Sequence, residues 1–171
     1  MQLSTLDATA QAALVKSGEA TPTELVDAAI ARIEKHDGEL NAVIMRRFDE
    51  ARAEAAKVDR AAPFAGVPIV VKDILAQVEG MPYTAGTRPL KAAGHRARRD
   101  SYLVASLKKA GFVIVGKTNT SELGILPAAE PAAWGATRNP WDLTRSTGGS
   151  SGGTGAAGAA GAGGGPSPSI F

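Results

Sequence analysis

Two short apolar runs rich in β-branched side chains, residues 67–71 and 112–115, constrain the fold of this chain more than any other feature. Each run follows a glycine and has the length of a strand that is buried on both faces. Between the runs, apolar residues recur within Tyr102–Ala110 at helical spacing, and Asp100 is the predicted cap of that helix. Strands that alternate with a helix favour a mainly parallel sheet covered by helices. The sequence therefore predicts an α/β fold.

The N-terminal third of the chain has the pattern of a helical region. Residues 8–16 carry apolar side chains with few helix breakers, which predicts a first helix. The segment Thr21–Glu24 has the pattern of a capping box with proline at the first helical position, and predicts a second helix that ends near Gly38. The apolar run 40–45 predicts a strand, and the Ala-, Glu- and Arg-rich stretch 46–60 predicts another helix.

The composition changes at the C-terminal end of the sequence. Ten of the chain's 20 glycines fall within residues 148–165, and residues 155–171 have almost no side chains that could fill a core. Glycine and proline are poor helix formers, so this Gly/Ala-rich tail is predicted to be disordered or loosely held. We therefore expect a partial domain over residues 1–157 and a low-complexity tail over residues 158–171.

The composition and charge of the chain exclude several classes of protein. The net charge of +2 gives no reason to expect nucleic-acid binding, and the basic cluster 95–99 lacks interleaved aromatic residues. The absence of cysteine excludes disulfides, thiolate metal sites and a cysteine nucleophile. The N-terminus lacks the basic and apolar regions of a secretion signal, and no apolar run approaches the roughly 20 residues of a membrane span. We expect a cytoplasmic protein that does not bind membranes.

A lysine and a pair of serines carry the chemistry that the sequence suggests. Lys72 ends an apolar run, where partial burial would let a lysine lose its proton and act as a base. Ser150 and Ser151 lie between glycine pairs, which let a backbone approach a ligand closely. Serine with lysine is an alternative to serine with histidine in acyl transfer. Each feature alone also fits a simpler interpretation, a lysine that reaches solvent or a flexible Gly/Ser linker.

Four motifs, taken together in their order and spacing, resemble the amidase signature family. The resemblance extends from about Val26 to about Ala157. The stretch 124–131 also resembles bacterial amidases near the 6-aminohexanoate cyclic-dimer hydrolases. The four motifs occupy residues 66–73, 116–124, 138–142 and 146–153.

The resemblance implies a Ser-cisSer-Lys triad on an α/β/α fold with a mixed central sheet. Lys72 matches the catalytic lysine of the family, and Ser150 matches the bridging serine that follows a cis peptide bond. The implied reaction is the hydrolysis of a carbon–nitrogen amide bond in a small molecule, with no metal or organic cofactor. The residues that the resemblance assigns to support of the serine loop are Gly148, Gly149, Ser151 and Gly152.

The sequence departs from the family pattern after the serine loop. The family's nucleophilic serine and oxyanion hole are expected beyond Phe171, and Ser169 lacks the glycine that precedes the nucleophile in the family motif. We therefore expect an N-terminal fragment without turnover. Two alternatives stay open: an A-subunit-like piece of a glutamine-dependent tRNA amidotransferase, with tRNA and other subunits as partners, and a non-catalytic remnant that serves as a binding module. Open strand edges also predict self-association.

Overall fold

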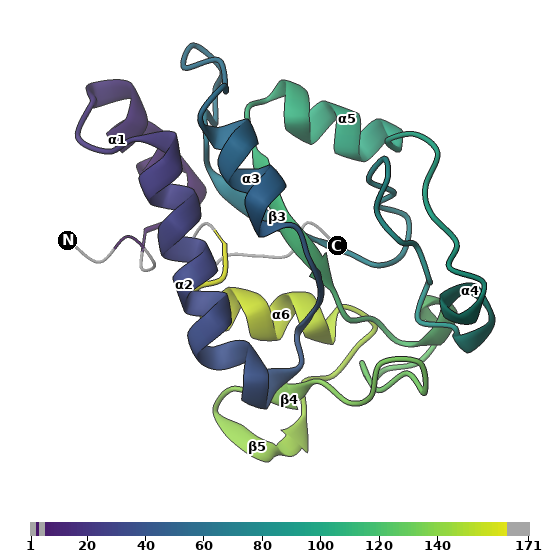
Figure 1. Ribbon diagram of the computed structural model, residues 1–171. Helices are drawn as coiled ribbons and strands as arrows, with labels where there is room; N and C mark the ends of the chain where they lie inside the picture. The colour runs from purple at the N-terminus through teal and green to yellow at the C-terminus, as the bar shows by residue number, and fades with distance from the viewer. Residues whose placement is uncertain (1–2, 4–5, 164–171) are drawn as a thin grey trace.

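The computed structural model describes residue 3 and residues 6–163 of the chain. Within these residues, a three-stranded sheet is surrounded by helices, and a short hairpin lies at one end (Figure 1). The strands are β1 (Val43–Arg46), β2 (Pro68–Lys72) and β3 (Val113–Thr118), with β4 (Arg138–Asn139) and β5 (Asp142–Ser146) in the hairpin. The helices are α1 (Ala8–Ser17), α2 (Pro22–Leu40), α3 (Phe48–Ala55), α4 (Arg88–Ala92), α5 (Tyr102–Lys109) and α6 (Gly152–Ala159).

The central sheet has the strand order β1-β3-β2 and mixed strand directions. The two predicted strands, β2 and β3, pair in parallel, and β1 pairs with β3 in the antiparallel sense. All six residues of β3 are buried, because β3 is the middle strand and helices cover both of its faces. The predicted α/β fold with a mixed central sheet is therefore confirmed.

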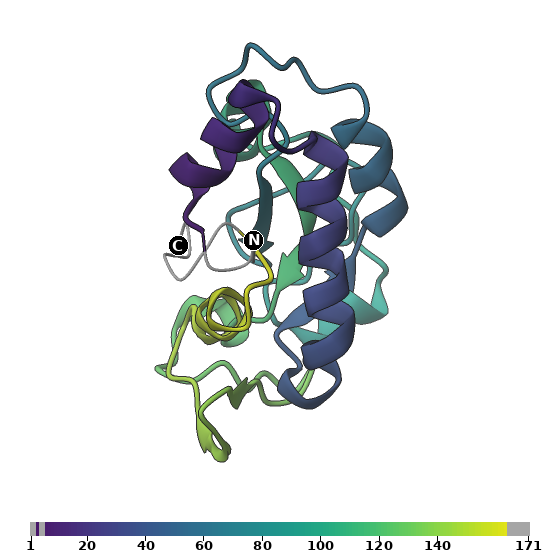
Figure 2. The ribbon, with the colours of Figure 1, turned by 90° about the vertical axis from the view of Figure 1, so that its left-hand side faces the viewer.

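Helices α2, α3 and α6 cover one face of the sheet. In Figure 2, α6 is seen end-on beside α2, and the two helices contact each other. The core on this face combines β-branched residues of the sheet with small residues of the helices. Its buried members include Val26, Ile30, Ile33, Ala51, Ala55, Val70, Val113, Val115, Ala156 and Ala157.

The opposite face of the sheet packs against α5 and the segment that follows β2. Figure 1 shows α5 on the side of β3 away from α2. Along β2 and β3, the buried residues of this second core alternate with those of the first, as the two-residue period of a strand requires. In β1, an irregularity between Val43 and Met45 interrupts this alternation. They are Met45, Val71, Ala76, Val78, Met81, Val104, Leu107 and Ile114. The two cores give the α/β/α layering that the resemblance implies.

The N-terminal helices follow the sequence prediction closely. Thr21 Oγ1 accepts a hydrogen bond from the Glu24 N–H at 3.2 Å, and Glu24 Oε2 accepts one from the Thr21 N–H at 2.7 Å, so the predicted capping box is present. Helix α2 continues to Leu40, slightly past the predicted end. Asn41 then ends it in the left-handed conformation, with φ of 51°.

Two helix predictions were wrong in detail. Ser101, not Asp100, caps α5, because its hydroxyl accepts from the Val104 N–H. Asp100 instead accepts from the Glu79 N–H at 2.7 Å and pairs with Lys108 at 2.8 Å. The helix predicted over residues 46–60 is shorter, and α3 covers only Phe48–Ala55.

The prediction of a disordered tail from Gly155 was wrong for the first part of that segment. Residues 152–159 form α6, which crosses the expected boundary between residues 157 and 158. Glycine and alanine let this helix lie very close to the sheet: a Cβ added at Gly153 would be 2.6 Å from the Asn119 nitrogen. Residues 164–171, with Ser169, lie outside the described residues. None of the helices in the described part of the chain is long and apolar enough to cross a membrane.

Candidate active site

Lys72 is the last residue of β2, and its side chain lies on the face of the sheet that α6 covers. It is paired in register with Thr118, the last residue of β3, whose hydroxyl contacts Thr154 of α6. The side chain of Lys72 is buried, with 8% of its surface exposed. The strand therefore delivers a buried amine to the loop that carries Ser150 and Ser151, whose side chains are half-buried.

The serine loop between β5 and α6 meets this amine. The Nζ of Lys72 lies 2.7 Å from Ser150 Oγ and 3.0 Å from Ser151 Oγ. The peptide bond between Gly149 and Ser150 is cis, at the position that the resemblance implies. The structure thus brings together the lysine and both serines that the sequence singled out.

The glycines of the loop fit its close packing. Gly148 has a φ of 74°, a left-handed conformation that glycine adopts without steric cost. A Cβ added at Gly149 would lie 2.5 Å from the Ala128 nitrogen, and one at Gly152 would collide with Thr147. Gly149 and Gly152 therefore leave no room for a side chain, whereas Gly148 has open space and needs glycine only for its backbone conformation.

The backbone of the serine loop is fastened to the segment that follows β3. The Ser150 carbonyl accepts from the Ser121 N–H at 3.3 Å, and the Gly148 carbonyl accepts from the Ala129 N–H at 3.1 Å. Ser151 was expected to support the loop by hydrogen bonding. Its carbonyl accepts from the Gly155 N–H at 3.0 Å in the first turn of α6, while its hydroxyl is turned to Lys72.

The surroundings of Lys72 favour its neutral form. Burial lowers the pKa of Lys72 from its ordinary value, because the ammonium loses hydration. Its Nζ also lies at the serines that precede α6, where the positive end of the helix dipole disfavours a cation. In the part of the chain that the structure describes, no carboxylate forms an ion pair with Lys72. A neutral amine in contact with a serine hydroxyl can accept its proton.

A buried ion pair next to Lys72 was missed in the sequence. Asp73 and Lys117 are both fully buried, and the Lys117 Nζ lies 2.5 Å from Asp73 Oδ1. Burial lowers the pKa of Lys117, and the Asp73 carboxylate opposes that lowering. Asp73 also accepts from the N–H and the hydroxyl of Thr84. A charged residue at the end of each apolar run was the available signal, but the sequence did not show that the two side chains meet.

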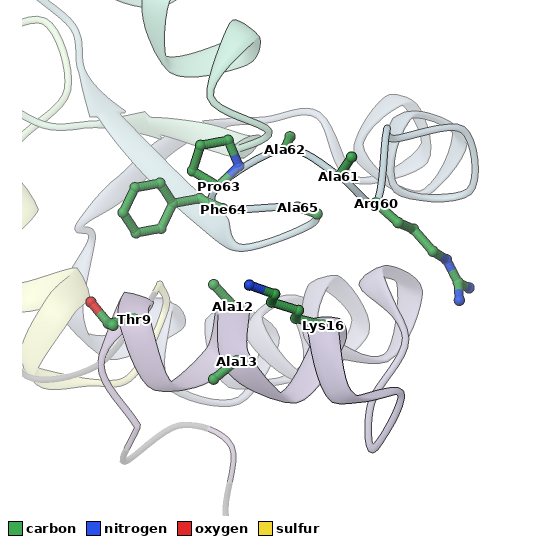
Figure 3. Close-up of a pocket in the computed structure, with 10 residues that line it drawn as sticks. All are labelled: Thr9, Ala12, Ala13, Lys16, Arg60, Ala61, Ala62, Pro63, Phe64 and Ala65. Carbon is green, nitrogen blue, oxygen red and sulfur yellow. The ribbon is translucent and has the colours of Figure 1, made fainter.

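A cleft of about 330 Å³ lies elsewhere, between α1 and residues 60–65 (Figure 3). Half of its lining residues are alanine, Phe64 and Lys16 also line it, and it includes neither Lys72 nor the serine loop. Among the described residues, no group of three or more His, Asp or Glu side chains could hold a metal ion. The lysine–serine cluster is therefore the candidate site.

Comparison with known proteins assigns this chain to a family. Residues 24–164 match the model of the amidase family, so the chain belongs to that family. It is 51% identical over 145 residues to a 6-aminohexanoate-cyclic-dimer hydrolase of Paenarthrobacter ureafaciens, covering 85% of this chain and 29% of the relative. It is 43% identical over 156 residues to the glutamyl-tRNA(Gln) amidotransferase A-subunit of Renibacterium salmoninarum, covering 87% of this chain and 29% of that protein.

Solved structures agree with this assignment. A 6-aminohexanoate cyclic dimer hydrolase complexed with substrate superposes with a TM-score of 0.90 at 49% identity, covering 95% of this chain and 33% of that one. Both the resemblance to the amidase signature family and the finer resemblance to the cyclic-dimer hydrolases are confirmed. The chain spans about a third of the length of these relatives. Its relatives thus include hydrolases of amide carbon–nitrogen bonds.

Proposed function

We propose that Lys72 and Ser150 are the base and the bridging serine of a Ser-cisSer-Lys centre that hydrolyses a carbon–nitrogen amide bond. The observation that supports this most directly is the 2.7 Å contact between Lys72 Nζ and Ser150 Oγ. A lysine with a lowered pKa and no carboxylate partner is suited to take a proton from a hydroxyl.

The proposed proton route runs through the bridging serine. Neutral Lys72 accepts a proton from Ser150, and Ser150 accepts one from a nucleophilic serine as that serine attacks the amide carbonyl. The proton then returns along the same groups to the leaving amine, and water hydrolyses the acyl-enzyme. Ser151 gives the Lys72 amine a second partner and so limits its rotation. Gly148, Gly149 and Gly152 support the loop in this scheme.

The nucleophile and the oxyanion hole are not among the motifs of residues 1–171. In this scheme Ser150 bridges and Ser151 supports, while Ser169 lacks the family pattern. Each oxyanion-hole donor is worth about 3–4 kcal/mol in the transition state. We therefore propose that the 171-residue polypeptide shows no turnover by itself. Amide hydrolysis by this polypeptide that Lys72→Ala abolishes would contradict the proposal.

The surroundings of Ser150 suit an uncharged aliphatic amide. A Cβ added at Gly124 would lie 3.9 Å from Ser150 Oγ, so this turn borders the site. Its neighbours Leu123, Ile125 and Leu126 are exposed by 54%, 75% and 56%. An apolar rim beside a proton-transfer pair favours a small-molecule substrate with methylene groups near the amide.

A chimaera tests the function without relying on the 171-residue polypeptide. Residues 1–164 of this chain are joined to the remaining sequence of the P. ureafaciens hydrolase, and hydrolysis of the 6-aminohexanoate cyclic dimer is followed by liquid chromatography. We expect turnover that falls by at least about 10²-fold with Lys72→Met, the usual contribution of a general base. The exposed Lys57→Met is the control. A folded Lys72→Met chimaera with full activity would refute the proposal.

The amidotransferase relatives support a second candidate function. At 43% identity, an A-subunit-like role would imply glutamine as substrate, with tRNA and other subunits as partners. Pull-down from cells with the tagged chain discriminates the two, since only this candidate predicts recovery of tRNA and of amidotransferase subunits. A non-catalytic binding module remains the third candidate. It predicts an inactive chimaera, together with self-association through the edge strands β1 and β2.

A further inference from the structure

Lys117 is a fully buried lysine that the proposed proton route does not use. Its Nζ contacts Asp73 Oδ1 at 2.5 Å and the Pro82 carbonyl at 3.0 Å, and lies 4.9 Å from the centre of the Tyr83 ring. Burying an ammonium and a carboxylate costs several kcal/mol per ion before their attraction is counted. This cost suggests that the Asp73–Lys117 ion pair has a role beyond packing.

This ion pair and the candidate site lie on opposite faces of the sheet. Lys117 pairs in register with Val71, and Thr118 pairs with Lys72. Since successive side chains point to opposite faces, Lys117 and Asp73 lie on the α5 face while Lys72 lies on the α6 face. Asp73 is nevertheless the residue directly after Lys72, so the two side chains leave the same end of β2 on opposite faces of the sheet.

The ion pair also fixes the segment on which the serine loop rests. Asp73 and Lys117 together hold residues 82–84 through Thr84 and the Pro82 carbonyl. The next residue, Ala85, accepts from the Leu123 N–H at 2.9 Å. The turn at Leu123 follows Ser121, whose N–H donates to the Ser150 carbonyl. A continuous chain of contacts therefore leads from Lys117 to the serine loop.

We propose that Lys117 is a positioning residue for the Lys72–Ser150 pair: it neutralises the carboxylate beside Lys72 and anchors the segment on which Ser150 is seated. The proposal rests on the function proposed above.

The other ionisable groups near the site are few. The residue after Ser121 is the exposed Glu122, Tyr83 contacts Lys117, and neither the loop 147–151 nor α6 carries a charge.

Charge neutralisation has a consequence that simple packing does not share. Without the Lys117 ammonium, the Asp73 carboxylate stabilises protonated Lys72, so the Lys72 pKa rises. Without the Asp73 carboxylate, the unpaired Lys117 ammonium disfavours protonated Lys72, and the Lys72 pKa falls. Removal of both charges leaves the Lys72 pKa close to that of the parent chain. A purely structural role predicts no such opposite signs.

The experiment is an NMR titration of the Lys72 side chain in the 171-residue chain with labelled lysine. The Lys72 signal is assigned by its loss in Lys72→Met. We expect shifts of about one pH unit, upward for Lys117→Met and downward for Asp73→Asn, with near cancellation in the double variant. The half-buried pair Asp100 and Lys108, neutralised by the same substitutions, is the matched control and should leave the Lys72 titration unchanged.

Shifts of equal sign, or no shift in folded variants, would overturn the proposal. If Lys117→Met does not fold, the nearly isosteric Asp73→Asn still tests the sign of the Lys72 pKa shift. Lys117→Arg keeps the positive charge and should leave the Lys72 pKa unchanged. The titration requires no turnover, so its outcome is independent of the proposed reaction. In the chimaera, Lys117→Met should move the pH–rate profile upward by the same amount. A Lys72 shift without that movement would count against the proposed function and leave the positioning role intact.

Discussion

The hydroxyls of Thr118 and Thr154 share a hydrogen bond of 2.7 Å between the end of β3 and the first turn of α6. Both side chains are almost fully buried. The bond fastens the helix that follows the serine loop to the strand beside Lys72. A helix built from glycine, alanine and one threonine has few other ways to fix its position on a sheet.

Valine in place of either threonine should test this attachment. Thr118→Val keeps the shape but leaves the Thr154 hydroxyl without this partner, which should lower the free energy of unfolding by about 1–3 kcal/mol. The double variant Thr118→Val/Thr154→Val removes both hydroxyls and should cost less than the sum of the single variants. Urea unfolding of the four proteins measures the coupling. Additive losses would mean that the two hydroxyls do not act together.

Substitution of alanine for two glycines of α6, Gly153 and Gly155, should change the stability of the fold in opposite directions. At Gly153 an added Cβ would be 2.6 Å from the Asn119 nitrogen, so Gly153→Ala should destabilise the fold by about 1–3 kcal/mol. At Gly155 nothing lies within 4 Å of the added Cβ. Because alanine is the better helix former, Gly155→Ala should stabilise the fold by about 0.5–1 kcal/mol. Thermal unfolding followed by circular dichroism compares them, and a gain in stability for Gly153→Ala would show that α6 does not pack this closely.

Much of the fold was predictable because local signals agreed with the tertiary structure. The continuous apolar runs of β2 and β3 and the capping box at Thr21 each specify their element within a few residues. Helix α6 was not predictable from composition. Propensity treats glycine as a helix breaker, whereas α6 gains from the close approach to the sheet that glycine permits.

The candidate site was predictable only in part. Lys72 and Ser150 lie 78 positions apart, and motif resemblance, rather than spacing, linked them. The Asp73–Lys117 pair could not be predicted in the same way. Whether two charged residues at strand ends meet depends on strand register and on the face to which each side chain points, and neither is encoded locally.

An exposed leucine in a left-handed conformation offers a test of backbone strain. Leu75 has a φ of 67° and 75% of its surface exposed, so its side chain gains little from burial. Leu75→Gly should stabilise the fold by about 1 kcal/mol, because the left-handed conformation costs an L-residue about that much. Leu126, which is 56% exposed and not left-handed, is the matched control. Leu126→Gly should be neutral or destabilising. Urea unfolding measures the stability of both variants. A loss of stability in Leu75→Gly would contradict the proposal that the backbone at Leu75 is strained.

The lowered pKa of Lys72 should make the stability of the fold depend on pH. Between the lowered pKa of the folded chain and the ordinary value of 10.5, the unfolded chain binds more protons at this position than the folded chain. The free energy of unfolding therefore gains a contribution that rises with pH through this window. Below the window both states carry the proton, and burial of the ammonium lowers stability by a constant amount.

Lys72→Met isolates this contribution, because methionine fills a similar volume and does not titrate. We expect the free energy of unfolding of the parent chain, minus that of Lys72→Met, to increase as pH is raised from 7 towards 10.5. Urea unfolding at several pH values measures the difference, and other titrating groups cancel between the two proteins. Lys57→Met, at an exposed position, is the control for loss of a lysine as such. A difference that falls with pH would mean that the folded chain stabilises protonated Lys72. The amine in contact with Ser150 would then be a cation at rest and could not be the base that takes the serine proton.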